Sequence, residues 1–281
     1  MKLIGLNGGE PFLREDLVEL FKFIRKKCPS ARLCINTNGL ATELIREKIK
    51  EILKIDKNVL IIISLDGIGK IHDEIRGIDG AYLRVINTIE TLKHLNVKNL
   101  SINFTILDKN IDQMEDVYNL AKKFGIYKIN YTLAYNSEFY YYTNENVFPK
   151  NIDRLKEQLN RIIVQYLRSF NFKNYFRAYF LSGIIPYIKY RYRPLPCSAG
   201  IYSLFIDCNG DIYPCPILNK KLGNLKTFDF KNIRLKGVYN DCPNKCWTDC
   251  TIFPLLRKKP YLALSRIIIM KLKALFGCDI V

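Results

Sequence analysis

Short apolar segments alternate with amphipathic segments along the first half of the chain, and this alternation is the strongest constraint on its fold. The apolar segments have the length of β-strands and span Leu3–Leu6, Leu33–Asn36, Val59–Ser64, Leu100–Thr105 and Lys128–Leu133. Between them, apolar residues recur at helical spacing over about 14–28, 41–54, 80–95 and 111–125. Strands that alternate with helices in this way pair in parallel through right-handed crossovers. We therefore predict an α/β sheet or barrel.

Polar and glycine-containing motifs follow the predicted strands. NGGEP (7–11) comes after the first strand, NTNG (36–39) after the second and SLDG (64–67) after the third. In parallel α/β folds the ligand-binding residues gather at the carboxyl ends of the strands. The two glycines of the first motif let backbone amides approach a ligand closely, and Glu10 supplies an acceptor beside them. Taken singly, each motif is equally typical of an ordinary turn.

In this order, GGEP, NTNG, SLDG followed by HDEIRG, and INFTIL resemble the core of the radical S-adenosylmethionine (radical SAM) enzymes. The resemblance implies a partial (β/α)6 barrel with S-adenosylmethionine as cofactor. It assigns the methionine amino group to Gly8, Gly9 and Glu10, and the carboxylate and ribose to Ser64 and Arg76. Asn38 and Asn103 would also line the pocket. A zwitterionic ligand needs an acceptor for its ammonium group and a cation for its carboxylate, so these residue types suit it.

The cysteines of the first half depart from that family's pattern. Its members carry CxxxCxxC after the first barrel strand, and these cysteines bind the 4Fe–4S cluster that chelates S-adenosylmethionine. Only seven residues precede GGEP here, and Cys28 and Cys34 have the wrong spacing. We interpret Cys28 as a helix-end residue and Cys34 as a buried strand residue. We thus expect a barrel that lacks its first β/α unit, with the catalytic residues unassigned and no cleavage of S-adenosylmethionine by the chain as given.

Seven of the nine cysteines lie from position 197 onward, and six of them form a dense group: Cys197, Cys208, Cys215, Cys242, Cys246 and Cys250. Clustered cysteines in a protein without a secretion signal are more often metal ligands than disulfides. An Asn209-Gly210 turn between apolar segments predicts a β-hairpin whose two turn residues both have positive φ, and this hairpin would bring Cys215 towards Cys197. By spacing alone, a zinc site and a 4Fe–4S cubane both remain open.

The cysteine motifs resemble the SPASM and twitch domains that follow radical SAM cores. The matching features are Cys197, the GDIYPC run that ends at Cys215, and CPNKCWTDC. The resemblance implies one auxiliary 4Fe–4S cluster in a small cysteine-rich domain of β-hairpin and helix. Its preferred ligands are Cys197, Cys215, Cys246 and Cys250, with Cys242 competing for one place. We expect Cys208 to lie at the hairpin edge without binding the cluster.

Four segments follow from these patterns. Residues 1–135 form the radical SAM core, 136–194 a bridging helical region, 195–252 the SPASM/twitch-like domain and 253–281 an amphipathic tail. Within the bridge, apolar periodicity predicts a helix over 151–170, and Tyr140–Tyr142 suggest an aromatic cluster. We expect the tail to dock on the protein body, with contact to a membrane surface as the lesser alternative.

Composition narrows the functional class. The formal charge of +17 is spread over predicted helix faces, and no recognition motif accompanies it, so nucleic-acid binding is not expected. No uncharged apolar run reaches the roughly 18 residues of a membrane span, and the chain starts almost directly with a strand. These features favour a cytoplasmic protein.

The combined prediction is a protein that binds S-adenosylmethionine and a 4Fe–4S cluster. In the intact protein we expect an oxidoreductase that modifies an unidentified substrate by radical chemistry. A peptide is the first expectation for that substrate, with a reductant protein as electron source. The alternative is a non-catalytic fragment or degenerate homologue that binds only an iron–sulfur cluster or zinc.

Overall fold

The computed structural model describes residues 2–135, 148–227, 242 and 246–281. Two compact units make up the chain, Met1–Tyr131 (unit 1) and Thr132–Val281 (unit 2). Tyr140–Tyr142, for which we predicted an aromatic cluster, lie outside the described residues. None of the helices described in the structure is both long and apolar enough to cross a membrane.

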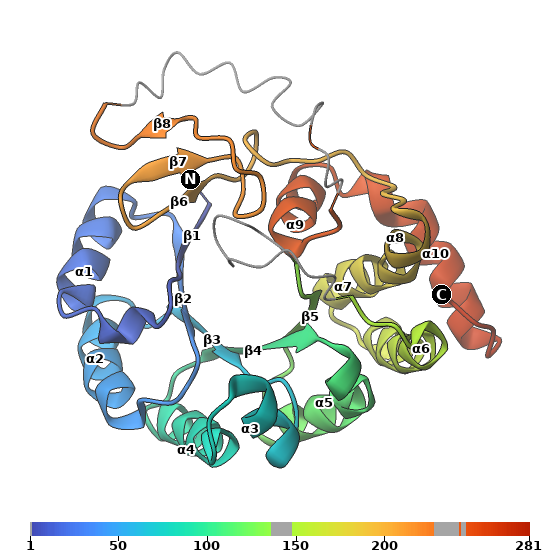
Figure 1. Cartoon of the computed structure of the whole chain (residues 1–281), viewed down its shortest axis with the longest axis horizontal. Coiled ribbons are helices and arrows are strands. Elements are labelled where there is room, and N and C mark those ends of the chain that lie inside the picture. Colours follow the sequence, from blue (N-terminus) through green and yellow to red (C-terminus); the bar gives the residue numbers. More distant parts are fainter. Residues whose placement is uncertain (1, 136–147, 228–241, 243–245) are drawn as a thin grey trace. The chain divides into compact units, whose positions relative to one another are not determined.

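Unit 1 is built on a curled sheet whose strands follow one another in chain order (Figure 1). The strands are β1 (Leu3–Leu6), β2 (Arg32–Thr37), β3 (Leu60–Ser64), β4 (Asn99–Ile106) and β5 (Ile129–Leu133). The pairs from β1 to β4 are parallel. The helices lie on the outside of the curve: α1 (Leu17–Lys27), α2 (Thr42–Ile55), α3 (Lys70–Arg76), α4 (Ala81–His94) and α5 (Met114–Lys123). The predicted α/β half-barrel is therefore confirmed.

The two faces of this sheet differ in chemistry. Ile35, Ile61 and Ile102 are fully buried, and Ile63 meets Val85 of α4 around Gly39, so this face packs against the helices. On the other face the strand register places Ser64 directly beside Asn103, and both are half-buried. Because side chains alternate along a strand, one face stays apolar while the other presents polar groups near the strand ends.

Helix α3 was not among the predicted elements. It is a short helix bounded by Gly69, with φ of 56°, and Gly77, with φ of 64°. Glycine adopts these left-handed conformations without steric cost, which allows the chain to enter and leave one helical segment within a tight loop. The sequence patterns assigned no helix to the HDEIRG motif and therefore missed the element that carries Arg76.

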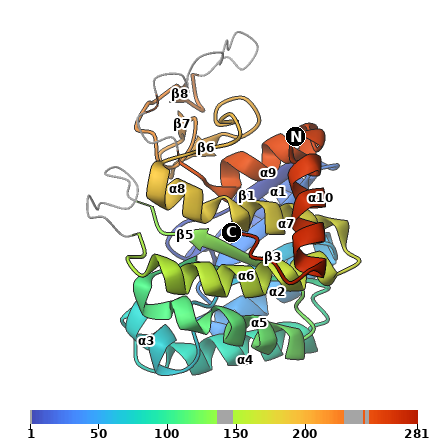
Figure 2. The ribbon, with the colours of Figure 1, turned by 90° about the vertical axis from the view of Figure 1, so that its right-hand side faces the viewer.

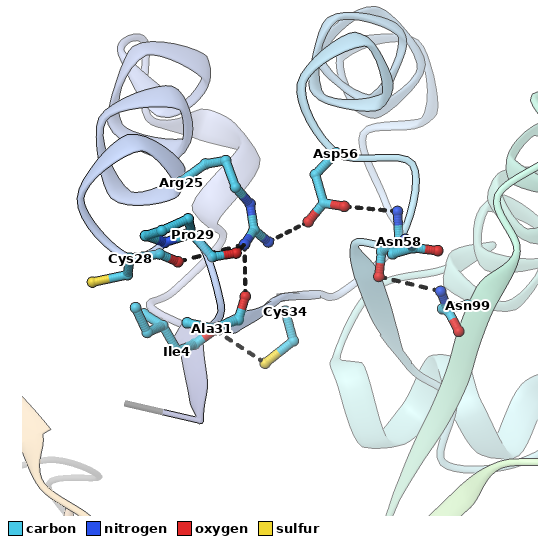
Figure 3. Close-up of polar contacts among 9 residues, drawn as sticks. All are labelled: Ile4, Arg25, Cys28, Pro29, Ala31, Cys34, Asp56, Asn58 and Asn99. Carbon is cyan, nitrogen blue, oxygen red and sulfur yellow. Dashed lines mark hydrogen bonds and ion pairs between the residues drawn. The ribbon is translucent and has the colours of Figure 1, made fainter.

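Arg25 holds the opposite, amino-terminal edge of the sheet together (Figure 3). Its guanidinium donates to the carbonyl oxygens of Pro29 and Ala31, each at 2.8 Å, and forms an ion pair with Asp56. Cys28 ends α1, and the Cys34 thiol lies buried in β2 near the Ile4 carbonyl at 3.6 Å. Both cysteines thus take the structural positions that we predicted for them.

Unit 2 combines five described helices with a small antiparallel sheet. The helices are α6 (Ile152–Arg168), α7 (Phe172–Ser182), α8 (Ile184–Tyr190), α9 (Asp249–Lys258) and α10 (Tyr261–Leu275), and the strands are β6 (Phe205–Ile206), β7 (Asp211–Tyr213) and β8 (Gly223–Asn224). The helix predicted over 151–170 is confirmed as α6. The tail forms part of α9 and all of α10, and α10 contacts α6, α7 and α9 as expected for a docked tail (Figure 2).

The hairpin of unit 2 turns differently from our prediction. Only Gly210 has positive φ, at 82°, whereas Asn209 does not. The turn runs from Asp207 to Gly210 and is closed by the Gly210 N–H donating to the Asp207 carbonyl at 3.1 Å. The Asp207 carboxylate also accepts from the backbone N–H of Asn209 and Asp211. This side-chain cap makes a longer turn with a single left-handed glycine more favourable than a two-residue turn.

Trp247 is the largest fully buried side chain of unit 2. Its ring stacks on Phe180 with centroids 5.8 Å apart, and its Nε1 donates to the Phe180 carbonyl at 2.7 Å. Tyr135 donates a hydrogen bond to the Trp247 carbonyl. The indole packs directly against Gly183, because a Cβ at that position would lie 2.5 Å from Trp247 Cζ2. The residue after Cys246 is therefore held from several sides.

We predict that Gly183→Ala destabilises unit 2 by about 1–3 kcal/mol, because the added methyl group must displace the buried indole. Urea unfolding followed by Trp247 fluorescence measures this loss. Gly9→Ala is the matched control, since no atom lies within 4 Å of its would-be Cβ. Equal stability of the two variants would show that the indole can shift without cost.

Candidate cofactor sites

Glu10 lies at the carboxyl edge of the unit 1 sheet and is tied to the neighbouring strand. Its Oε2 accepts from the Thr37 hydroxyl at 3.0 Å and from the Asn38 N–H at 2.7 Å, while Oε1 accepts from the Phe12 N–H at 3.2 Å. These three donors fix the carboxylate across the ends of β1 and β2. Sequence reasoning found Glu10 but missed Thr37, whose role becomes visible only when the two strands are paired.

The backbone beside Glu10 is open. Gly8 and Gly9 are exposed, and no atom lies within 4 Å of the position that a Cβ would take on either residue. A ligand can therefore approach the peptide groups of this loop without meeting side chains. The residues present fit the methionine end of S-adenosylmethionine in this respect.

Ser64 and Asn103 are neighbours in the register at the ends of β3 and β4. Within the described residues, neither side chain makes a hydrogen bond to another part of the protein. By contrast, Ser101, two residues earlier on the same face of β4, donates to the Lys128 carbonyl at 3.0 Å. The ends of β3 and β4 thus leave two half-buried polar side chains, Ser64 and Asn103, available to a ligand.

Asn38 and Arg76 also lie at this edge but already have partners. Asn38 Oδ1 accepts from the Leu40 N–H at 3.0 Å, which uses its carbonyl within a local turn. The Arg76 guanidinium forms an ion pair with the buried Asp66 carboxylate at 2.5 Å. Asp66 in turn accepts from the Thr105 N–H at 2.7 Å. Arg76 therefore braces the loop after β3, and a ligand carboxylate would have to share its charge with Asp66.

His72 completes the brace around Asp66. Its Nδ1 accepts from the Asp66 N–H at 3.0 Å, so the buried imidazole is neutral and carries its proton on Nε2. Burial, followed by the positive charge of Arg76, lowers the pKa of His72 from 6.5 to about 4. Burial also raises the pKa of Asp66. Sequence reasoning missed both residues as parts of the site, because only the folded loop brings them into contact.

In unit 2, four cysteine side chains line one cavity of about 140 Å³: Cys197, Cys215, Cys242 and Cys246. They come from three segments that are separated along the chain, namely the start of the SPASM-like region, the hairpin and the last cysteine motif. Cys208 lies exposed in the hairpin turn, as expected. Cys242 thus takes the place in the cavity lining that we had expected for Cys250.

Cys250 lies just beyond this lining, in the first turn of α9. Its thiol donates to the Thr248 hydroxyl at 3.2 Å. Burial of the sulfur, followed by the charge of Asp249, raises the pKa of Cys250 well above its usual value. The charges that Cys246 and Cys215 carry as thiolates also raise the pKa of Cys250, so Cys250 lies near the cysteines of the cavity. Its hydrogen bond to Thr248 nevertheless gives it a partner inside the protein.

Arg193 closes the cavity next to the thiols. Its guanidinium donates to the carbonyl oxygens of Leu195 at 2.6 Å, Pro196 at 3.3 Å and Cys246, and to the Thr251 hydroxyl at 3.2 Å. These four hydrogen bonds connect the segment before Cys197 to the segment around Cys246. Sequence reasoning missed Arg193, for which no motif gave a signal.

Burial favours the protonated form of two of these thiols, Cys215 and Cys246. Burial, followed by the nearby Cys215, raises the pKa of Cys246 to about 12, and burial also raises the pKa of Cys215. The charge of Arg193 acts in the opposite direction on Cys246. The Leu218 N–H donates to Cys215 Sγ at 3.3 Å, an interaction that favours the thiolate. Metal uptake would therefore release protons and become easier at higher pH.

The donor set fits an iron–sulfur cluster better than a single ion. Four thiolates on one zinc, each at about 2.3 Å, would lie within about 4 Å of one another. The four cysteines line a cavity of about 140 Å³, and thiols that surround a cavity leave room for a cubane between them.

The chain matches two family models and resembles solved structures of known proteins. Residues 2–121 match the family model of the radical SAM superfamily, and residues 197–251 match that of SPASM, an iron–sulfur cluster-binding domain. The fold is similar to anSMEcpe with bound AdoMet and Cp18Cys peptide, with a TM-score of 0.61, 17% identity and coverage of 96% of this chain and 85% of that chain. Streptococcus suis SuiB bound to S-adenosylmethionine has a TM-score of 0.54, with 19% identity over 86% of this chain and 55% of SuiB.

Curated relatives are similar over parts of their length. The subtilosin biosynthesis protein AlbA of Bacillus subtilis is 24% identical over 81% of this chain and 48% of AlbA. The AdoMet-dependent heme synthase of Methanosarcina barkeri is 26% identical over 81% of this chain and 66% of that protein. The pre-heme d1 synthase of Dinoroseobacter shibae is 34% identical over 44% of this chain. The chain thus spans less than two thirds of these relatives, down to 29% of the last.

The cavity lining predicts which cysteines hold a cluster. Cys242→Ser should lose most of the iron and sulfide taken up on anaerobic reconstitution, because it removes one of four thiols around the cavity. Cys250→Ser should keep the cluster, and Cys208→Ser is the matched control on the exposed turn. Iron and sulfide analysis with visible absorbance measures the uptake. Loss of the cluster in Cys250→Ser but not in Cys242→Ser would restore our original ligand set.

His72 predicts a pH dependence of stability. Because its pKa in the folded state lies below its usual value, the folded state binds fewer protons, and stability falls as pH decreases from about 6.5 to about 4. The loss approaches roughly 3 kcal/mol. Urea unfolding at several pH values should show this slope in the wild type and a smaller one in His72→Asn, which keeps a neutral acceptor. Asp66 titrates in both proteins, so an unchanged slope would exclude His72 as the source.

Proposed function

We propose that this chain, which belongs to the radical SAM superfamily and carries a SPASM domain, holds S-adenosylmethionine at the sheet edge of unit 1 and one auxiliary 4Fe–4S cluster in the cysteine cavity of unit 2. The two matched domains imply these cofactors. The substrate that we propose for the whole protein is a peptide.

The observation that carries the proposal is the convergence of four thiols on one cavity from three separate chain segments. A cubane needs ligands that approach from different directions, and a hairpin plus a later cysteine motif supplies them. Arg193 would bind no iron itself. Its contacts hold the ligand segments in register, and its charge offsets the negative charge of thiolates gathered in a buried place.

At the sheet edge, the roles of the residues follow from their partners. Glu10, fixed by three donors, would accept from the ligand's ammonium group beside the open Gly8-Gly9 backbone. Ser64 and Asn103 would complete the polar contacts with groups that the protein itself does not use. With a reduced cluster held by a CxxxCxxC motif, which this chain does not carry, S-adenosylmethionine would supply a carbon radical for hydrogen abstraction from a substrate. The protein's part is to orient these groups and to exclude water.

Two observations support a peptide as the substrate. AlbA serves the biosynthesis of a bacteriocin, and anSMEcpe was solved with a bound peptide.

We predict that Ser64→Ala and Asn103→Ala each weaken S-adenosylmethionine binding about threefold to tenfold, the effect of one hydrogen bond, while the folded protein keeps its stability. Ser101→Ala is the matched control, because its hydroxyl serves the protein and not the ligand. Ser101→Ala should lower the free energy of unfolding and leave the affinity for S-adenosylmethionine unchanged. Calorimetric titration and urea unfolding measure the two quantities.

The binding data separate the proposed function from its alternative. Unchanged affinity in both Ser64→Ala and Asn103→Ala would place the ligand elsewhere. Incubation of the cluster-loaded chain with dithionite and S-adenosylmethionine should give no 5′-deoxyadenosine, because the chain carries no CxxxCxxC motif for the cluster that cleaves this ligand. A version extended by a segment with three cysteines at that spacing tests turnover. Modification of a candidate peptide by that version would support the proposal in full, and no reaction with both clusters loaded would favour the binding-only alternative.

A further inference from the structure

Helix α10 has two apolar faces, although only one of them is used within unit 2. Ala263, Ile267 and Met270 are buried, where the helix contacts α6, α7 and α9. The opposite face exposes a second set of large apolar side chains: Tyr261, Leu264, Ile268, Ile269, Leu272, Leu275 and the cap residue Phe276. Figures 1 and 2 both show α10 at the outer rim of the unit 2 helices.

The exposed set forms one continuous surface. At 100° per residue its members fall within an arc of about 140°, and Ser265 is the one polar residue inside this arc. Ile268 is 59% exposed and Leu275 is 79% exposed. Single exposed apolar residues are usual on a protein exterior. A continuous apolar surface on a helix is normally covered by a partner.

The charge around this surface is of one sign. Residues 251–277 contain six Lys or Arg side chains and no Asp or Glu. Arg257, Lys258 and Lys259 are exposed just before α10 begins, and Arg266, Lys271 and Lys273 lie at the margins of the apolar arc. The Asp279 carboxylate, which follows α10, pairs with Lys156 of α6 at 3.0 Å.

We propose that the outer face of α10 binds the surface of an anionic lipid membrane. An apolar face bordered by cations is the pattern of helices that lie in the plane of a membrane, with the apolar side chains below the headgroups and the lysines beside them. A second copy of the chain is a poorer occupant, because two such faces would bring twelve cations together. The proposal does not depend on the cofactors or on the substrate.

The test is co-sedimentation of the purified chain with vesicles. The chain should bind vesicles of equal parts phosphatidylglycerol and phosphatidylcholine at least tenfold more tightly than vesicles of phosphatidylcholine alone. The double variant Ile268→Asp/Leu272→Asp should lose at least tenfold in affinity, because two charges replace apolar groups at the centre of the face. Lys258→Gln/Lys259→Gln should lose about fivefold per removed charge at low salt.

Leu83→Asp is the matched control, since Leu83 is 68% exposed on α4 of unit 1, and it should bind as the wild type does. Circular dichroism establishes that each variant keeps its helices. No binding to anionic vesicles, equal binding to neutral vesicles, or an unaffected double variant would each overturn the proposal. A dimer in light scattering that Ile268→Asp/Leu272→Asp dissolves would overturn it as well, by assigning the face to a second copy.

Discussion

The parallel register of the unit 1 sheet is the constraint on which its candidate site depends. Parallel strands joined by helical crossovers end at the same edge, so residues far apart in the chain become neighbours there. Glu10 reaches Thr37 and Asn38, and Ser64 stands beside Asn103, only because β1 to β4 pair without slippage. A shift of one residue would turn Ser64 towards the helices and an isoleucine towards the edge.

In unit 2 the corresponding role belongs to side chains, because its sheet is too small to position a site. Arg193 connects the chain before Cys197 to the chain around Cys246 through four acceptors. Trp247, fitted against Gly183 and stacked on Phe180, fixes the same segment from the other direction. These contacts place the cysteines around one cavity, where burial raises the pKa of Cys215 and Cys246. The packing of the helices thus keeps the cysteine side chains close together, although as thiolates they would repel one another.

At the edge of the unit 1 sheet, the polar groups differ in how far other protein groups satisfy their hydrogen bonds. Asp66 is joined to Arg76 by an ion pair and to His72 by a hydrogen bond, although Arg76 Nε and His72 Nε2 have no hydrogen-bond partner in the described structure. Ser64, Asn103 and the Gly8-Gly9 backbone are left without such partners in the described structure. Polar groups of the second kind are the ones that can bind a ligand at little cost, because no internal bond has to be broken first.

The sequence by itself determined the elements and the chemistry of this protein. Periodicity predicted the strands and most helices, since a strand repeats every two residues and a helix every 3.6. The motifs identified Glu10, Ser64, Asn103 and the group of cysteines as candidate ligands. These are local properties, because a motif needs only its own residues to be recognised.

Only the tertiary structure decided which of these residues face a common space. The motifs favoured Cys250 as a ligand over its competitor Cys242, but the start of α9 places Cys250 beside Thr248, and Cys242 lies in the cavity lining. Arg76 forms an ion pair with Asp66 because it lies on α3, a short helix bounded by two glycines. No sequence motif indicates this pairing. The apolar residues of α10 divide into a buried and an exposed set only when α6, α7 and α9 are in place. Each of these outcomes depends on distances between segments that are remote in the chain, which composition and spacing do not contain.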